Sequence, residues 1–159
     1  MMALFGCAIL LFDFFPFLRQ RRDLLLLLAV AEAFAGYGLI QQLRWVGANG
    51  VPLHGFDGAV TVDNFSIFFN WIFLAAAVIV AISSYKYLEV AGEHHGEYYS
   101  LILFAQCGMY FLATGTDLVT LFIGLELMAL TFYVMVGFLR GDRRSNEAAI
   151  KYLLLGAFS

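Results

Sequence analysis

Five long apolar runs dominate the sequence, and a sixth begins close to its end. They cover residues 2–18, 24–43, 65–85, 98–114 and 118–139, and the sixth starts at residue 148. A helix needs roughly 17–25 apolar residues to cross the ~30 Å hydrocarbon core of a bilayer. Transmembrane barrel strands would instead alternate apolar and polar residues over about 10 positions. The sequence therefore predicts an all-α fold. We expect one transmembrane domain over residues 1–159, a polytopic helical bundle of five full helices and a truncated sixth.

The composition excludes a water-soluble domain. Hydrophobic residues make up 62% of the chain and charged residues 13%, whereas charged residues make up about a quarter of a soluble domain. The net charge of −3 offers no basic surface for nucleic acid. We therefore expect the lipid bilayer to surround the chain, and we expect no nucleic-acid partner.

Basic residues alternate between the predicted loops. Seven of the nine Lys and Arg residues lie in the first, third and fifth loops, and Arg44 is the only one in the second and fourth. Because cytoplasmic loops of membrane proteins are enriched in Lys and Arg, this pattern places the odd loops in the cytoplasm and the N-terminus outside. The second loop, residues 44–64, contains Pro52 and several glycines. We expect it to be an ordered, turn-rich excursion on the outer side.

The most informative ionisable residue is Glu126, near the middle of the fifth run. A charge at the bilayer centre costs at least about 2.5–3.5 kcal/mol, so charges inside membrane helices commonly mark ion or proton pathways. Residues at helical spacing from it, such as Phe122 and Leu130, are mostly apolar. A neighbouring cation or entering water would change its protonation state, as a proton relay requires. We predict that Glu126 carries protons. The alternative is a neutral glutamate hydrogen-bonded between helices.

Lys151 and Glu32 are further candidates for the transport site. Lys151 would lie about 9 Å from the cytoplasmic edge and Glu126 about 21 Å from it, so we expect no direct ion pair. Lys151 fits a water-bridged relay and snorkelling to the interface equally well. Glu32 lies among small residues such as Ala33 and Gly36, which allow close helix packing. We therefore favour a packed, protonated role for Glu32 over a secondary transport site.

The sequence offers no evident site for a metal or a cofactor. Adjacent His94 and His95 point apart on a helix and have no further Cys or His nearby, so they indicate a solvated loop. Glycine motifs for nucleoside phosphates and dinucleotides are missing, as are CxxC pairs. We expect no redox cofactor on this chain.

Three stretches carry a resemblance to a known family: GEYYS at residues 96–100, DLVTLFIGLELM at 117–128 and RSNEAAIKYLLLGAF at 144–158. They resemble subunit N of bacterial NADH:quinone oxidoreductase (respiratory complex I), one of the antiporter-like membrane subunits. The resemblance is specific from about residue 63 onward. It is looser over the first two helices, where mainly the hydrophobic layout and the Arg cluster agree.

The resemblance implies proton translocation driven by quinone reduction elsewhere in the complex. Glu126 matches the essential fifth-helix glutamate of the family, and Lys151 matches a sixth-helix lysine. The principal partner lysine, on a seventh helix, would follow Ser159, so the chain would form part of the first antiporter-like repeat and would not pump alone. NADH, FMN, iron-sulfur clusters and quinone would bind to the complex and not to this chain. Its partners would be other membrane-arm subunits in the bacterial inner membrane.

Two alternatives stay open. A cation/proton antiporter subunit or a membrane-bound hydrogenase subunit would share the fold and the buried Glu and Lys, and sodium dependence would distinguish it. A structural or nonfunctional membrane fragment would use its buried charges only to fix helix packing. In that case, Glu126→Gln would leave pumping intact.

Overall fold

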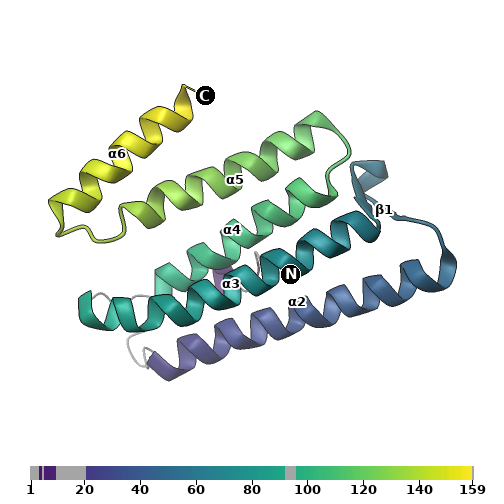
Figure 1. Cartoon of the computed structure of the whole chain (residues 1–159), viewed down its shortest axis with the longest axis horizontal. Helices are drawn as coiled ribbons and strands as arrows, with labels where there is room; N and C mark the ends of the chain where they lie inside the picture. Colours follow the sequence, from purple (N-terminus) through teal and green to yellow (C-terminus); the bar gives the residue numbers. More distant parts are fainter. Residues whose placement is uncertain (1–3, 5, 10–20, 92–95, 159) are drawn as a thin grey trace.

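Long helices that run alternately in opposite directions make up most of the molecule (Figure 1). The computed structural model describes residues 4, 6–9, 21–91 and 96–158. Within these residues the helices are α2 (Arg21–Asn49), α3 (Asn64–Ala91), α4 (Gly96–Thr114), α5 (Leu118–Val136) and α6 (Arg143–Ala157). The predicted all-α class is confirmed.

Three of these helices are long and apolar enough to cross a membrane: α2 over Leu25–Asn49, α3 over Asn64–Val90, and α5. Most of the first predicted run, residues 2–18, falls outside the described residues. Five full crossings and an external N-terminus therefore stay predictions.

Acidic residues fix where several helices begin. The Asp117 Oδ1 atom accepts a hydrogen bond of 2.6 Å from the Thr120 backbone N–H at the start of α5. Asp142 accepts in the same way from the Arg144 N–H at the start of α6, at 2.9 Å. Such caps satisfy backbone N–H groups that have no partner within the first helical turn. The Asp142 cap explains why α6 begins five residues before the apolar run at residue 148.

The Asp117 cap gives a prediction about stability and pH. The backbone N–H of Thr120, with the Thr120 side chain as a second donor, holds the pKa of Asp117 below its ordinary value of 3.8. Because the folded pKa is the lower one, the charged cap stabilises the fold above pH 3.8, and this contribution is lost as the pH falls through the folded pKa. Asp117→Ala should therefore unfold at a lower temperature than the unmodified protein at pH 7 in detergent. The difference in unfolding temperature between the two proteins should become smaller at acid pH.

Asp117→Asn is the matched control for this prediction, because asparagine also caps helices well. Its unfolding temperature should be close to that of the unmodified protein. Equal unfolding temperatures for all three proteins at pH 7 would show that the cap does not stabilise α5.

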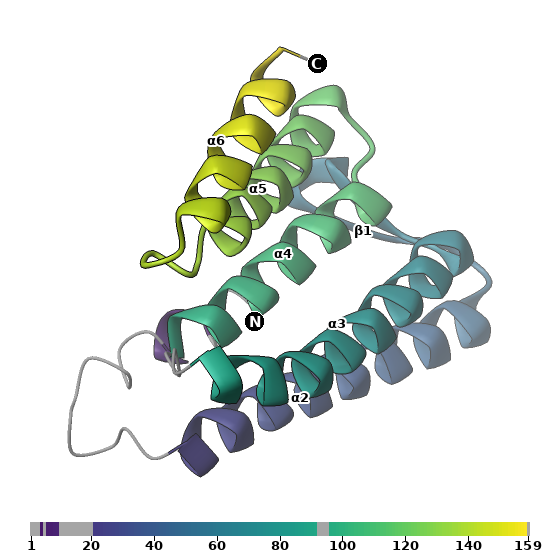
Figure 2. The same ribbon diagram turned by 60° about the vertical axis from the view of Figure 1, so that its left-hand side comes forward.

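Helix α4 lies in the middle of the bundle. It has α5 on one side and α3 on the other in both views (Figures 1 and 2). Its buried positions include small or polar residues: Ser100, Ala105, Gln106, Gly108 and Thr114. Large apolar residues instead face outward, with Ile79 of α3 63% exposed and Phe122 of α5 61% exposed. Small and polar residues inside and large apolar residues outside are typical of helices that pack in lipid.

The second loop folds into a short β-hairpin, a feature that the sequence reading did not include. Strand β1 (Leu53–Gly55) pairs antiparallel with β2 (Val60–Val62), and the 3₁₀ turn η1 (Phe56–Gly58) joins them. The hairpin also docks on the turn between α4 and α5, where the Thr116 N–H donates to the Ala59 carbonyl at 3.1 Å. Strands of three residues are too short to show an alternating pattern in the sequence.

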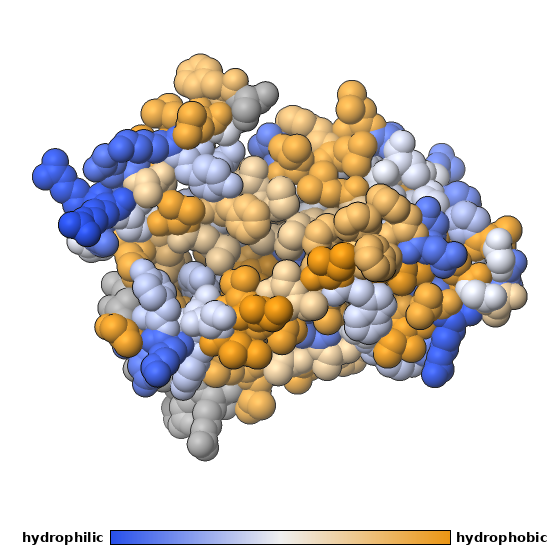
Figure 3. Space-filling view, viewed as in Figure 1, coloured by the Kyte–Doolittle hydropathy of each residue, from blue (hydrophilic) through white to orange (hydrophobic). Residues whose placement is uncertain are grey.

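Most of the basic residues gather at one end of the bundle. The N-terminus of α2, the C-terminus of α3 and the turn between α5 and α6 lie together on the left of Figure 1 and carry Arg21, Lys86 and Arg140. We call this the basic end, and the opposite end, which carries β1 and β2, the hairpin end. Apolar side chains cover the middle of the visible face, and hydrophilic ones gather toward both ends (Figure 3). This is the surface expected of a bundle that crosses a bilayer.

Candidate functional site

Glu126 lies near the middle of α5. It follows Leu118 by eight residues and precedes Val136 by ten, which places it about 12 Å and about 15 Å from the two helix ends. Its side chain is half-buried. Within the described ranges 4, 6–9, 21–91 and 96–158, its carboxyl has no hydrogen-bond or ion-pair partner.

Close contact between two glycines fixes the position of Glu126. A Cβ atom on Gly108 of α4 would lie 2.7 Å from the Met128 backbone N and 2.8 Å from the Gly124 carbonyl O of α5. Only glycine leaves room for this crossing, because real Cβ atoms do not approach other backbone atoms so closely. Since each residue turns the helix by about 100°, Glu126 points roughly opposite to the buried Gly124. The carboxyl therefore faces away from α4, on the side of Tyr133.

Helix α6 covers part of this side of α5. The rings of Tyr133 and Tyr152 are 4.9 Å apart between centroids. One turn away, a Cβ atom on Gly137 would lie 2.9 Å from the Ala149 Cβ. This antiparallel register places Lys151 level with residues 134–135, about 13 Å along the axis from Glu126.

Lys151 pairs with a neighbour on its own helix. Its Nζ atom lies 2.6 Å from the Glu147 Oε1, and the Lys151 side chain is 69% exposed. Glu147 is one turn closer to the basic end, so the lysine side chain is directed toward that end. The structure thus keeps Lys151 and Glu126 apart along the helix axes. The sequence predicted this separation from the different depths of the two residues in the membrane.

Glu32 lies in a buried polar cluster that joins α2 to α4. The Gln106 Nε2 atom donates to the Glu32 Oε2 at 3.1 Å and to the Tyr110 hydroxyl at 2.8 Å. Glu32 is 7% exposed and Gln106 is fully buried. We define these three residues as the Glu32 cluster. The sequence reading identified Glu32 but missed Gln106, although a lone amide inside an apolar run is a signal of the same kind.

Metal ligation finds no support in the described part of the chain, which contains no group of three or more His, Cys, Asp or Glu residues that could hold an ion. His94 and His95, for which the sequence predicted a solvated loop, lie outside the described residues.

Comparison with known proteins agrees with these features. A sequence model of the family described as "NADH:quinone oxidoreductase/Mrp antiporter, TM" matches residues 115–159. "NADH-quinone oxidoreductase subunit N 2" of Solibacter usitatus is 76% identical over 162 residues, which cover 100% of this chain and 33% of that protein. "NADH-quinone oxidoreductase subunit N" of Trichlorobacter lovleyi is 40% identical over 158 residues, covering 99% of this chain and 31% of that protein. The chain belongs to the subunit N family. It spans about one third of the length of the curated relatives that it matches.

The family match divides the candidate residues into two groups. Glu126 and Lys151 fall inside the matched residues 115–159, as does the helix pair α5 and α6. The Glu32 cluster falls outside them. The matched family model thus covers the half-buried carboxyl of Glu126, and the buried carboxyl of Glu32 needs an explanation of its own.

Proposed function

We propose that this chain is part of a proton-translocating membrane subunit of NADH:quinone oxidoreductase and that Glu126 carries the proton. The observation that supports this most directly is a carboxyl at mid-helix without a partner in the described part of the chain. A carboxyl with only a structural role would be hydrogen-bonded, because an unpaired polar group in hydrocarbon is costly. A carboxyl that changes its charge needs partners that can be exchanged, such as water or a movable cation.

Lys151 would act on Glu126 through its electric field. While Lys151 is paired with Glu147, the two charges largely cancel at a distance. If that pair opens, the lone cation would act on Glu126 from at least about 13 Å away, a distance at which two unit charges interact by ~1.3 kcal/mol or less at an effective dielectric constant of about 20. Proton transfer over such a distance would pass through water. The pair of Glu147 and Lys151 is therefore a switch that can couple events at the basic end to Glu126.

The rest of the activity would belong to the complex. Electrons would pass from NADH through FMN and iron-sulfur clusters to quinone in other subunits, and this chain would hold none of these groups. Its partners would be the other membrane-arm subunits, and its location the bacterial inner membrane. These assignments rest on relatives named as NADH-quinone oxidoreductase subunits, of which the chain spans about one third.

A cation/proton antiporter subunit is the second candidate, because the matching family description names the Mrp antiporter as well. Membrane vesicles distinguish the two. NADH-driven proton uptake should fall in inverted vesicles when the gene is deleted, return when it is restored, and be the same with and without sodium. Unchanged uptake after deletion would contradict the proposal, and uptake that requires sodium would favour the antiporter.

A further inference from the structure

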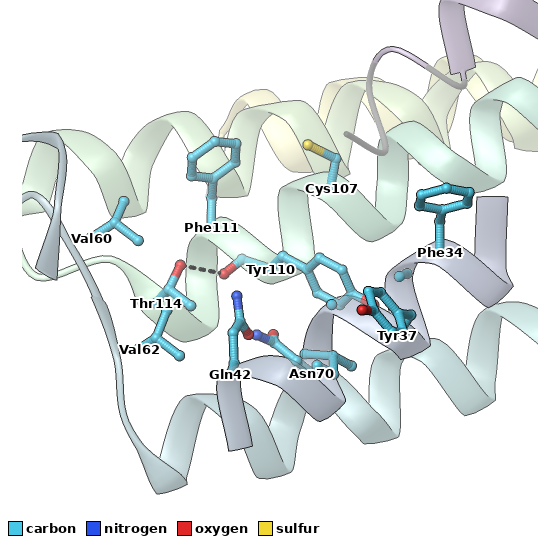
Figure 4. Close-up of a pocket in the computed structure, with 13 residues that line it drawn as sticks. Phe34, Tyr37, Gln42, Val60, Val62, Asn70, Cys107, Tyr110, Phe111 and Thr114 are labelled. Atoms are coloured by element: carbon cyan, nitrogen blue, oxygen red, sulfur yellow. Dashed lines mark hydrogen bonds between the residues drawn. The ribbon is translucent and has the colours of Figure 1, made fainter. Parts of the chain in front are cut away.

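A pocket of about 530 Å³ lies between α2, α3 and α4, and residues of β2 also line it (Figure 4). Val60, Val62 and Thr114 line it at the hairpin end. Ala35 and Tyr110 line it deeper in the bundle. From Gln42 to Ala35 the pocket follows α2 for about 10 Å. Since a water molecule takes about 30 Å³ of liquid volume, the pocket has room for several.

The pocket contains hydrogen-bond acceptors that lack donors. The Gln42 Oε1 and the Asn70 Oδ1 are both buried without a hydrogen-bond partner among the described residues. Both residues line the pocket, Gln42 from α2 and Asn70 from α3 (Figure 4). Asn70 is 3% exposed. A buried acceptor without a donor is costly, and a ligand that donates hydrogen bonds removes that cost.

Gln106 and Glu32 also have hydrogen-bond acceptors that lack donors. Tyr110 lines the pocket, and its hydroxyl is bonded to the amide of Gln106, which is in turn bonded to Glu32. The remaining oxygens of this amide and this carboxyl, Gln106 Oε1 and Glu32 Oε1, are also buried without a partner in the described residues. Two unpartnered acceptors therefore line the pocket, and two more lie behind its lining at Gln106 and Glu32. Water suits them because it donates two hydrogen bonds, whereas the carbonyl oxygens of a quinone or an ester would add acceptors.

We propose that this pocket is a water-filled vestibule reached from the hairpin end, and that Glu32 exchanges its proton with that water. Glu32 lies behind the pocket lining and is joined to it through Gln106 and Tyr110. In the exchange the carboxyl O–H bond breaks, the proton passes to a water oxygen, and the carboxylate keeps the electron pair. Gln106 is a positioning residue that holds the carboxyl against α4. The vestibule gives the chain a second proton-binding carboxyl, which is separate from Glu126 and does not depend on the function proposed for it.

The lining of the pocket agrees with exchange to water rather than to a basic side chain. The titratable groups on the pocket side are Tyr37 of α2 and Cys107 and Tyr110 of α4, and α3 contributes the neutral Asn70. Within the described part of the chain, no Lys, Arg or His lines the pocket. A proton that leaves Glu32 therefore has water as its acceptor.

Thiol labelling tests the vestibule in membranes that contain the full-length protein. Cys7 and Cys107 would first be replaced by Ala, and one cysteine would then be introduced at a time: Ala35→Cys at the inner end of the pocket, or Ala33→Cys on the exposed outer face of the same helix. Asp57→Cys, exposed in the hairpin, marks the hairpin side. A charged methanethiosulfonate reacts with thiolate in water, so Ala35→Cys should react within about tenfold of the Asp57→Cys rate and from the same side. Ala33→Cys should stay unreactive.

Infrared spectroscopy of the full-length protein in membranes tests the carboxyl itself. The C=O band that disappears in Glu32→Gln should shift when H₂O is replaced by D₂O, and the shift should be complete within the mixing time. A reaction of Ala35→Cys as slow as that of Ala33→Cys would overturn the vestibule and indicate a lipid-filled or sealed pocket. A Glu32 band that D₂O leaves unchanged would overturn the exchange. Either measurement is independent of pumping, so its failure leaves the role of Glu126 untouched.

Discussion

Replacing Glu126 by Gln is expected to remove most proton translocation from the assembled enzyme while the subunit stays in the membrane. Gln keeps the shape of the side chain but cannot release a proton, and removal of a proton-transfer group slows its step by roughly 10²–10⁴-fold. Because Glu126 is half-buried and points away from the contact between α4 and α5, the neutral amide should not disturb packing. The measurement is NADH-driven proton uptake by inverted vesicles, normalised to the amount of subunit detected by immunoblotting.

Two control variants show whether the effect belongs to this carboxyl. Glu126→Asp keeps the acid at a shorter reach and should retain part of the uptake. Glu89→Gln removes an exposed glutamate from the end of α3. This variant should leave proton uptake close to normal. If Glu126→Gln pumps as well as Glu89→Gln at equal protein level, Glu126 is a packing residue, and the structural alternative is the better explanation of the chain.

The second large effect is expected from Gly108→Ala, at the crossing of α4 and α5. The new methyl group would meet the Met128 N and Gly124 O backbone atoms of α5 at distances that real Cβ atoms do not show, so the two helices would have to separate. Overpacking of this kind typically costs about 1–3 kcal/mol, and here the obstacle is backbone that cannot rotate away. We expect a clearly lower unfolding temperature in detergent and less protein in the membrane.

Gly38→Ala is the matched control for Gly108→Ala. Gly38 lies within α2, and a Cβ atom there would have no other atom within 4 Å. Since Ala favours helix by about 1 kcal/mol over Gly, this variant should be at least as stable as the unmodified protein. Equal stability of the two variants would mean that the crossing of α4 and α5 is looser than the structure describes.

The lengths of the apolar runs predicted most of the helices that the structure describes. Runs such as 65–85 and 118–139 are recognisable because the bilayer imposes a minimum length on any helix that crosses it. The exact ends of the helices were harder to predict from the sequence. Helix α3 continues to Ala91, since a helix does not stop where its side chains leave the hydrocarbon. The hairpin was missed because the contact that secures it, between Ala59 and Thr116, joins residues far apart in the sequence.

The candidate site was predictable only where a charge stands out against apolar neighbours. Glu126, Lys151 and Glu32 could be identified in this way, and the depth difference between Glu126 and Lys151 followed from helical rise. Gln106 could not be assigned to Glu32, because the two are 74 residues apart and nothing local indicates that their helices meet. The pocket was not predictable either, since it depends on how three helices and a strand are spaced.

The docking of the hairpin also limits the order in which the protein can assemble. Residues 53–62 leave the ribosome well before Thr116, yet the Thr116 hydroxyl donates to the Gly58 carbonyl, 58 residues earlier, and its N–H donates to Ala59. A contact between residues so distant in the chain forms late, because the intervening segment must first be in place. During synthesis, α2 and α3 can therefore enter the membrane as a pair, but the segment that links them has to wait for the turn between α4 and α5. Until that turn arrives, the hairpin side of the nascent protein is open to chaperones and proteases.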